Sequence, residues 1–306
     1  MRTVVGRSRK GQRCASRITS EFRSRAAATC AHAGSSSELK KLARRLTAMV
    51  VLWLPDGYNL ATSQWRYTFL HWMRRPHEQD FRALALLNFN SSPLLVDVGA
   101  NIGQSVLSLY AVFPNATVVS FEPNPIVFRK LQRLTKKFPQ LTVIPNGLSN
   151  EAGEAELFIP SYNRSAISGL ASFDYESARG WLGKERIAGF DPNKLTVASK
   201  RVTLARLDDW GLGPDFIKID VQGLEYKVLA GGLETIRKYR PVIMAETIRY
   251  ESDAHRIVQP LDYCLMEFDG HSFIEVRGEI RHSNQFLIPI ERLPNGFGHS
   301  YVQDTA

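Results

Sequence analysis

Two glycines and a carboxylate near the middle of the chain have the types and spacing of a nucleoside-binding site. In LLVDVGANIGQSVLSLY, residues 94–110, Gly99 and Gly103 stand where an apolar strand-like run gives way to an apolar helical run. Glycine lets the backbone turn tightly and approach a ligand, and the start of the next helix offers N–H groups to an anion. Glu122 follows Gly99 by 23 residues, close to the roughly 20-residue offset of an acid that binds ribose hydroxyls. Together these residues predict a ligand that contains a nucleoside.

The spacing of the glycines argues against a dinucleotide. Residues 99–103 read GANIG, so the second and third glycines of the G-x-G-x-x-G fingerprint are missing. A dinucleotide needs that close backbone approach for its pyrophosphate. S-adenosylmethionine does not, because it carries only an amino-acid carboxylate and ammonium beside its nucleoside. Asp97, just before the loop, is expected either to meet that ammonium or to order the loop.

Asp220 and Glu246 are the candidate catalytic residues, because each ends an apolar strand-like run, in FIKID and PVIMAE. A carboxylate within hydrogen-bond reach of an alcohol can take its proton as a new bond to the oxygen forms. Two alternatives stay open. The pair holds a divalent cation such as magnesium, or Asp220 caps the helix that begins near residue 224 or contacts a cofactor. No metal ligand is assigned.

Alternating strand-like and helix-like segments from residue 93 onward position these residues. Apolar strands that alternate with amphipathic helices indicate an α/β fold, with a mostly parallel sheet covered by helices on both faces. Ligands of such sheets bind beyond the carboxyl ends of the strands. The loops at Asp97, Glu122, Asn146, Asp220 and Glu246 are therefore expected to converge on one crevice. Lys218, inside FIKID, is expected to be paired or to lie at the rim of the site, because an unpaired buried lysine is costly.

Several motifs, in this order, resemble the FkbM-type class I methyltransferases: DVGANIGQ, FEPNP, NGLSNEAGEAELF, VTLARLDDW, FIKIDVQGLEYKVLAGG and PVIMAE. The resemblance covers about 93–290 and implies a Rossmann-like fold with a mostly parallel seven-stranded sheet. It implies S-adenosyl-L-methionine as cofactor and ribose binding by Glu122. DVQG stands where DVEG is common, so Gln222 is given no acidic role. The residues expected to bind the cofactor are Asp97, Gly99, Ala100, Asn101, Gly103, Glu122, Pro123, Asn146, Gly147, Leu148, Ser149 and Asp220.

The same resemblance implies methylation of a hydroxyl oxygen on a sugar or secondary metabolite, so the expected partner is a small-molecule or glycan acceptor. No firm nucleic-acid partner is predicted, and the oligomeric state is not predicted. Two other function classes stay open. One is a nucleic-acid methyltransferase aided by the basic tail, which lacks support because no N/D-P-P-Y/F signature appears at KIDVQG. The other is a noncatalytic scaffold that binds the cofactor.

The charge of the chain is concentrated at its beginning. Residues 1–45 contain 12 of the 39 Lys and Arg but only 2 of the 30 Asp and Glu. Residues 1–36 are expected to form a basic, disordered tail, and 37–90 a helical N-terminal extension. The S-adenosylmethionine-binding domain is expected at 91–295, with 159–200 as a lid over the acceptor that offers Tyr162, Ser168, Ser172 and Trp181. A packing insertion is the alternative for that segment.

The sequence contains no apolar run of the roughly 18 residues that a membrane-spanning helix needs. Its three cysteines, Cys14, Cys30 and Cys264, have no C-x-x-C spacing, which favours a reducing compartment and argues against a zinc site. A cytoplasmic location is expected. Organelle targeting by the Arg- and Ser-rich tail stays open as an alternative, as does a start codon further along the chain.

Overall fold

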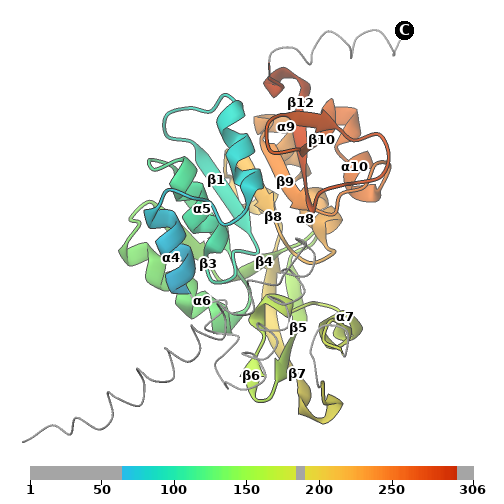
Figure 1. Ribbon diagram of the computed structural model, residues 1–306. Helices are drawn as coiled ribbons and strands as arrows, with labels where there is room; N and C mark the ends of the chain where they lie inside the picture. The colour runs from blue at the N-terminus through green and yellow to red at the C-terminus, as the bar shows by residue number, and fades with distance from the viewer. Residues whose placement is uncertain (1–63, 184–189, 295–306) are drawn as a thin grey trace, which may run out of the picture.

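A computed structural model of the chain describes residues 64–183 and 190–294, in which a mixed sheet and a smaller second sheet are surrounded by short helices (Figure 1). The main sheet has the order β11-β10-β12-β9-β8-β1-β2-β3. Its strands are β1 Leu94–Val98, β2 Thr117–Phe121, β3 Leu141–Ile144, β8 Phe216–Ile219, β9 Val242–Glu246, β10 Tyr263–Phe268, β11 Phe273–Glu275 and β12 Asn284–Pro289.

Six strands of the main sheet run in one direction, while β12 and β11 are antiparallel to their neighbours. The pairs β1–β2, β1–β8, β2–β3 and β8–β9 are parallel, and β12 runs antiparallel between β9 and β10. The expectation of a mostly parallel sheet is therefore confirmed, but the count of seven strands is wrong by one. The additional strand, β11, has three residues and pairs with β10 at the edge of the sheet.

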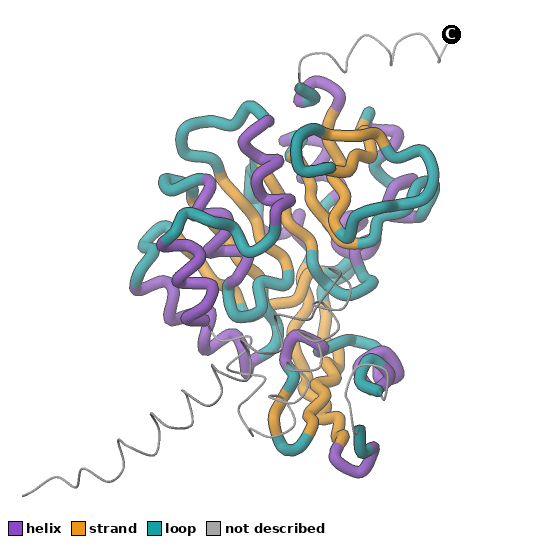
Figure 2. The backbone as a smooth tube through the Cα atoms, in the orientation of Figure 1, coloured by secondary structure: helices purple, strands orange, loops and turns teal. Residues whose placement is uncertain are grey.

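Two apolar clusters cover the two faces of the main sheet. Alternate strand residues, such as Leu95 and Val96 of β1, belong to different clusters because successive side chains point to opposite faces. Figure 2 shows helices on both sides of the strands. One cluster includes residues of α5 (Gln104–Val112), the end of α6 (Pro125–Gln132) and the 3₁₀ helix η1 (Gln79–Leu86). The other includes residues of α8 (Glu225–Gly231), α9 (Leu233–Tyr239) and α10 (Asp253–Arg256).

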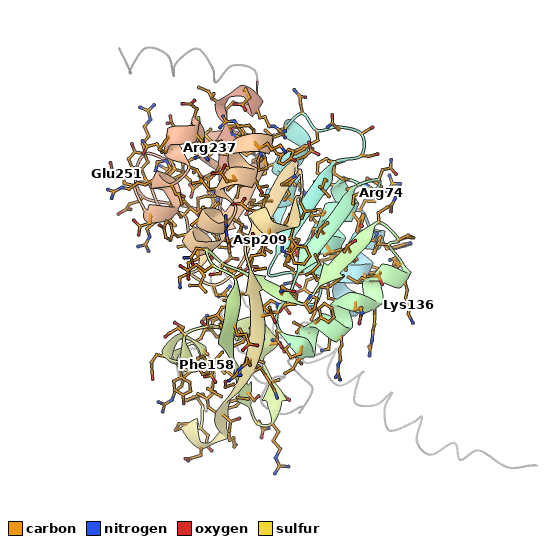
Figure 3. The ribbon with its side chains drawn as sticks, turned by 180° about the vertical axis from the view of Figure 1, so that it is seen from behind. Arg74, Lys136, Phe158, Asp209, Arg237 and Glu251 are labelled. Carbon is orange, nitrogen blue, oxygen red and sulfur yellow. The ribbon has the colours of Figure 1, made fainter. Side chains whose placement is uncertain are left out.

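The second sheet has the order β4-β7-β5-β6 and lies beyond one end of the main sheet (Figure 1). Its strands are β4 Asn146–Leu148, β5 Gly153–Tyr162, β6 Ser165–Ala166 and β7 Leu195–Ala205. Phe158, on β5, lies in this part of the molecule, well apart from Asp209 of the main domain (Figure 3). The two ends of the segment expected as a lid, 159–200, are thus strands of a long hairpin, and helix α7 (Tyr175–Gly180) lies between them.

One glycine joins the second sheet to the helices of the main sheet. A Cβ atom at Gly231, in α8, would lie 1.9 Å from the backbone oxygen of Ser149, which follows β4. A contact this short is sterically forbidden, so only glycine allows the helix to approach the strand end so closely. Because Ser149 also donates its backbone N–H to Ala205 of β7 at 2.9 Å, the second sheet is held against α8 through backbone atoms.

The part of the N-terminal segment that the structure describes consists of helix α4 (Gln64–Trp72) and η1. Helix α4 lies beside α5 (Figure 1), and the His71 imidazole is 3.0 Å from the backbone oxygen of Leu107. Phe81 and Leu84 of η1 are fully buried in the main core. The expected tail at 1–36 and the helix expected after it lie outside the described residues. Over 64–183 and 190–294, no helix is long and apolar enough to cross a membrane.

Candidate functional site

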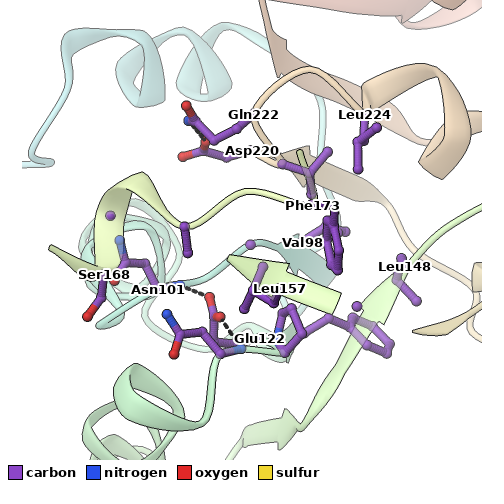
Figure 4. Close-up of a pocket in the computed structure, with 18 of the residues that line it drawn as sticks. Val98, Asn101, Glu122, Leu148, Leu157, Ser168, Phe173, Asp220, Gln222 and Leu224 are labelled. Carbon is purple, nitrogen blue, oxygen red and sulfur yellow. Dashed lines mark hydrogen bonds between the residues drawn. The ribbon is translucent and has the colours of Figure 1, made fainter. Parts of the chain in front are cut away.

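A hollow lies at the carboxyl ends of β1, β2 and β8, where the second sheet meets the main sheet (Figure 4). It holds about 840 Å³ of space that contains no protein atoms, including the part open to solvent. Its lining residues come from four regions of the chain: Val98, Gly99, Asn101 and Gln104; Phe121, Glu122, Pro123 and Asn124; Gly147, Leu148, Leu157, Ser168, Gly169, Ala171 and Phe173; and Asp220, Val221, Gln222 and Leu224.

The loop after β1 approaches the end of β8 so closely that its first residue must be glycine. Gly99 has a φ of +82°, and a Cβ atom there would lie 1.9 Å from the backbone oxygen of Asp220. Its N–H donates to the backbone oxygen of Phe121 at 2.9 Å. Gly99 therefore joins the loop to both neighbouring strands. Gly99 was predicted to let the backbone approach a ligand. The structure adds a second requirement for glycine here, the contact with Asp220.

Glu122, at the end of β2, places its carboxylate under the same loop. One carboxylate oxygen accepts the N–H of Asn101 and the other accepts the N–H of Asn124, each at 2.7 Å (Figure 4). The side chain is 6% exposed, and burial raises its pKa to about 7 even though the two N–H donors lower it. Each oxygen keeps one lone pair, so the fixed carboxylate can accept further hydrogen bonds from hydroxyl groups in the hollow.

Two buried polar atoms beside the hollow have no hydrogen-bond partner among the described residues: Gln104 Oε1 and Asn124 Nδ2. Gln104 is the first residue of α5, after Gly103, and the helix start adds unpaired N–H groups. Buried polar atoms are nearly always paired in folded proteins. An acceptor and a donor left unpaired at the lining of a hollow indicate that a polar ligand completes them.

The second sheet and the chain that follows it form an apolar wall. Leu148, Leu157 and Phe173 line the hollow together with Ser168, which begins the short 3₁₀ helix η3 (Ser168–Leu170) (Figure 4). Removing the faces of a flat aromatic ring from water and placing them against such apolar side chains is favourable. The wall therefore suits the base of a nucleoside.

Asp220 lines the hollow from the end of β8 and is held by two donors. Lys218 Nζ lies 3.1 Å from one carboxylate oxygen, and Gln222 Nε2 lies 3.1 Å from the other. The Lys218 side chain is only 3% exposed. Burial lowers the pKa of this lysine, but the negative charges of Asp220, Asp97, Glu78 and Glu246 raise it overall. The sequence left open whether Lys218 is paired or lies at the rim of the site. The structure shows it paired with Asp220, and it stays positively charged.

Glu246, the second candidate base, is half-buried at the end of β9 and is not among the residues that line the hollow. Burial and the negative charge of Asp220 raise its pKa to about 7, and Lys218 lowers it. The strands end side by side in the order β2, β1, β8, β9. Glu246 therefore lies on the far side of Asp220 from Glu122.

The structure brings together only some of the residues that the sequence predicted. Gly99, Asn101, Glu122, Pro123, Gly147, Leu148 and Asp220 line the hollow, whereas Asp97, Ala100, Gly103, Asn146, Ser149 and Glu246 do not. Of the five strand-end residues expected to converge on one crevice, Glu122 and Asp220 line the hollow, and Asp97, Asn146 and Glu246 do not. Asp97 is fully buried and accepts the hydroxyl of Ser105 at 2.6 Å, so its position suits the loop-ordering alternative. Asn146 begins a strand of the second sheet instead of ending one of the main sheet.

Four functional candidates were missed from the sequence: Gln104, Asn124, Leu157 and Phe173. Gln104 directly follows Gly103 in DVGANIGQ, and Asn124 stands two residues after Glu122 in FEPNP, so their position in those motifs was the available signal. No periodicity marks Phe173. Of the four residues expected to offer contacts from the lid, Ser168 lines the hollow. Tyr162 instead is buried, and its hydroxyl accepts the N–H of Asp191 at 3.0 Å.

The comparison with known families agrees with this site. Residues 97–284, more than half of the chain, match the family described as Methyltransferase FkbM domain. The chain belongs to the FkbM methyltransferase family. This confirms the resemblance seen in the motifs. The α/β sheet described above, with parallel central strands and helices on both faces, is the architecture that the resemblance implied.

Three relatives show the range of similarity. The chain is 32% identical to "Methyltransferase sdnD" of Sordaria araneosa over 48% of its own length and 62% of that protein. It is 25% identical to "2-O-methyltransferase NoeI" of Sinorhizobium fredii over 61% of its length and 78% of that protein. It is 30% identical to "Hexuronic acid methyltransferase AglP" of Haloferax volcanii over 55% of its length and 61% of that protein. The matches thus span less than two thirds of the Sordaria and Haloferax proteins.

Among solved structures, the FkbM methyltransferase from Methylobacillus flagellatus is similar with a TM-score of 0.43 and 17% identity, over 80% of this chain and 58% of that one. Within the described residues, no group of three or more His, Cys, Asp or Glu side chains is arranged to hold a metal ion.

Proposed function

We propose that this FkbM-family chain is an S-adenosylmethionine-dependent O-methyltransferase whose acceptor is a hydroxyl group of a sugar or secondary metabolite. One observation carries the proposal: Glu122, held by two backbone N–H groups, faces a hollow that also contains unpaired Gln104 Oε1 and Asn124 Nδ2. An acid that binds a diol, a helix start and an apolar wall are the three features that an adenosyl amino acid requires.

The residues of the hollow fit the three parts of S-adenosylmethionine. Glu122 would accept hydrogen bonds from the ribose hydroxyls. Leu148, Leu157 and Phe173 would contact the adenine, and Gln104 with the first N–H groups of α5 would hold the amino-acid end. When bound, the sulfonium supplies an already activated methyl group, so most of the catalytic effect comes from alignment.

Asp220 and Glu246 would orient the acceptor and take its proton. The two donors on Asp220, Lys218 and Gln222, fix its carboxylate at the edge of the hollow. The Glu246 side chain makes no hydrogen bond with any described residue, and a carboxylate with a pKa of about 7 is well matched to remove a proton near neutral pH. We therefore assign the general base to Glu246 and the orienting role to Asp220.

The names of two relatives support the acceptor class. One is called a 2-O-methyltransferase and another a hexuronic acid methyltransferase. The first name states transfer to an oxygen atom, and the second names a sugar acid as the molecule that is methylated. We propose a hydroxyl of a saccharide or a similarly hydroxylated metabolite.

Cofactor binding is tested by calorimetry with S-adenosylmethionine and, in parallel, NAD. We expect the first to bind and Glu122→Ala to raise its Kd by about 10- to 100-fold, because hydrogen bonds to a charged group contribute about 1.5–3 kcal/mol. Glu154→Ala, at an exposed carboxylate on the hairpin, is the control. Unchanged affinity in the Glu122 variant would contradict the assignment of the hollow.

Methyl transfer is tested by incubation with isotope-labelled S-adenosylmethionine and a panel of neutral sugars, uronic acids and phenols, followed by mass spectrometry of the products. We expect label on an oxygen of a hydroxylated acceptor. Glu246→Gln should lower kcat by about 10²- to 10⁴-fold and leave the cofactor Kd unchanged. A product labelled on nitrogen or on a nucleic acid would contradict the proposed acceptor class.

A further inference from the structure

One face of the main sheet carries a row of polar side chains near the carboxyl ends of its strands. In the ladders, Asp97 pairs with Lys218, and Glu246 pairs with Asn284. Directly paired residues point to the same face of a sheet. Alternation along each strand places all four on the face of Leu95, Phe216, Met244 and Phe286, which belong to a single apolar cluster. This face thus changes from apolar to charged where the strands end.

The segment before η1 covers the charged end of this face. Asn284 Nδ2 donates to Glu78 Oε2 at 3.2 Å and to Asp80 Oδ2 at 2.7 Å. The other carboxylate oxygen of Glu78 lies 3.3 Å from His77 Nε2, and His77 is fixed in turn to Ser108 Oγ of α5 by its backbone N–H at 2.9 Å. Glu78 is therefore held over the sheet by contacts from β12 and, through His77, from α5.

We propose that Glu78 is a positioning residue of the transfer site, and that it acts with the buried Lys218 to set the charge balance of Asp220 and Glu246. Glu78 lies outside the matched family domain, which begins at residue 97. The inference rests on the proposed function, because it concerns the group assigned as the base.

Charge is unbalanced in the partly buried space around Lys218. Among the described residues, four carboxyl groups, those of Asp97, Asp220, Glu78 and Glu246, face two basic side chains, Lys218 and His77. Lys218 donates its hydrogen bond to Asp220. Glu78 stays ionised: burial raises its pKa, but His77, Lys218 and Asn284 lower it to about 2. Because two basic side chains cannot neutralise four carboxylates, Glu246, which receives no hydrogen bond from a described residue, retains its proton most readily.

The groups that act on Glu246 come from three places. Asp220 and Lys218 face it from β8, Glu78 from the N-terminal segment and Glu225 from α8. Lys218 lowers the pKa of Glu246, and the three carboxylates raise it. Loss of the Glu78 charge removes the repulsion between Glu78 and ionised Glu246. It also removes one of the carboxylates that offset the positive charge of Lys218, so Lys218 attracts the remaining carboxylates more strongly. Both effects lower the pKa of Glu246.

The charge of Glu78 can be removed with little disturbance, since its side chain is 39% exposed. Glu78→Gln keeps the size of the side chain, and Glu78→Ala removes the same charge without adding a donor next to Asn284. Asp80→Asn is the matched control. It changes a carboxylate of the same segment that is bound to the same amide, but Asp80 is not among the main charges acting on Lys218 or Glu246.

The experiment is a carbon-13 NMR titration of the full chain labelled at glutamate side chains, with the Glu246 signal assigned by its loss in Glu246→Gln. We expect the midpoint of Glu246 to fall by roughly half a pH unit in Glu78→Gln and Glu78→Ala, the effect of one charge in partly solvated surroundings. Asp80→Asn should leave the midpoint unchanged, and Glu78→Asp should restore it. The acid limb of kcat should move to lower pH by the same amount.

An unchanged Glu246 midpoint in both charge-removing variants would overturn the inference, and so would an equal fall in Asp80→Asn. The NMR titration does not require turnover. If the Glu246 midpoint shifts but the protein transfers no methyl group, the coupling between Glu78 and Glu246 is supported and only the proposed function is contradicted. Thermal unfolding and calorimetry on each variant separate an effect on charge from a loss of structure.

Discussion

At the scale of single residues, backbone packing and charge burial both act at the hollow. Gly99 is required where the first loop touches the backbone of Asp220. Glu122 is held as a nearly enclosed carboxylate by the N–H groups of Asn101 and Asn124. Both arrangements cost folding free energy, in the one case through an unusual φ and in the other through burial of a carboxyl group. Costs of this kind are commonly concentrated where a protein binds ligands.

A glycine pair tests the packing requirement. Gly99→Ala should destabilise the chain by about 3 kcal/mol or more, since it combines a positive φ with a backbone contact that no Cβ can accept. Gly153→Ala is the control, because Gly153 has nothing within 4 Å of the added Cβ. Urea unfolding of both variants measures the difference. Similar stabilities would contradict the close approach of the loop to β8.

The pKa of Glu246 has a consequence for stability. A carboxyl group whose pKa rises from 4.5 to about 7 on folding stabilises the fold most fully below pH 4.5, and this contribution is lost as the pH rises through 7. Glu246→Gln should therefore raise the free energy of unfolding at pH 8 by about 1–2 kcal/mol, allowing for solvent screening, and change it much less at pH 5. Denaturant unfolding at the two pH values checks this. An equal effect at both would show that the group does not titrate between them.

At the scale of elements, the segment 159–200 contributes to the wall of the hollow. The sequence predicted it as a lid over the acceptor, with a packing insertion as the alternative. Its residues Ser168, Gly169, Ala171 and Phe173 line the same hollow as Gly99 and Glu122. The hairpin is thus part of the wall that we assign to the cofactor.

Phe173 tests this assignment. Phe173→Ala should raise the Kd of S-adenosylmethionine by roughly 10-fold, since loss of a partly buried aromatic contact costs about 1–2 kcal/mol. Tyr175→Ala is the control on the same segment, because Tyr175 is 42% exposed and contacts Phe158 outside the lining of the hollow. Calorimetry on both variants gives the comparison. If both variants bind S-adenosylmethionine with equal affinity, the segment has a role at the acceptor or in packing and does not bind the cofactor.

The sequence predicted what depends on local pattern and missed what depends on distant pairing. The runs at Leu95 and Ile217 are apolar enough to mark buried parallel strands, and the family motifs marked Glu122 and Asp220. The ten-residue pairing of β5 with β7 joins Gly153 to Leu204 across a long insertion, and no single-chain periodicity reveals such a pairing. Phe173 reaches the hollow only through that pairing.

At the scale of the whole molecule, the site lies at the junction of two sheets. The main sheet supplies Glu122 and Asp220, and the second sheet supplies Leu148 and Leu157. A ligand in the hollow contacts both sheets at once. Its binding energy should therefore stabilise their junction as well as the loops that it touches.

Hydrogen exchange measures this coupling. S-adenosylmethionine should slow amide exchange in residues 98–104 and 122–124 and also in 168–173, because ligand binding suppresses the local opening of every segment that it contacts. Exchange in β10 and β11, at the opposite edge of the main sheet, serves as the internal control and should not change. Protection confined to the first two segments would mean that the hairpin does not form part of the binding site.

The approach of α8 to the carbonyl oxygen of Ser149 has a consequence for chimeric enzymes. Exchange of the hairpin between relatives would replace residues 150–205 and with them part of the wall that we assign to the cofactor. The recipient must nevertheless keep glycine at position 231, outside the exchanged segment. Any side chain there would collide with the backbone oxygen of Ser149 and displace the transplanted sheet. A graft that fails should be inspected first at this distant residue.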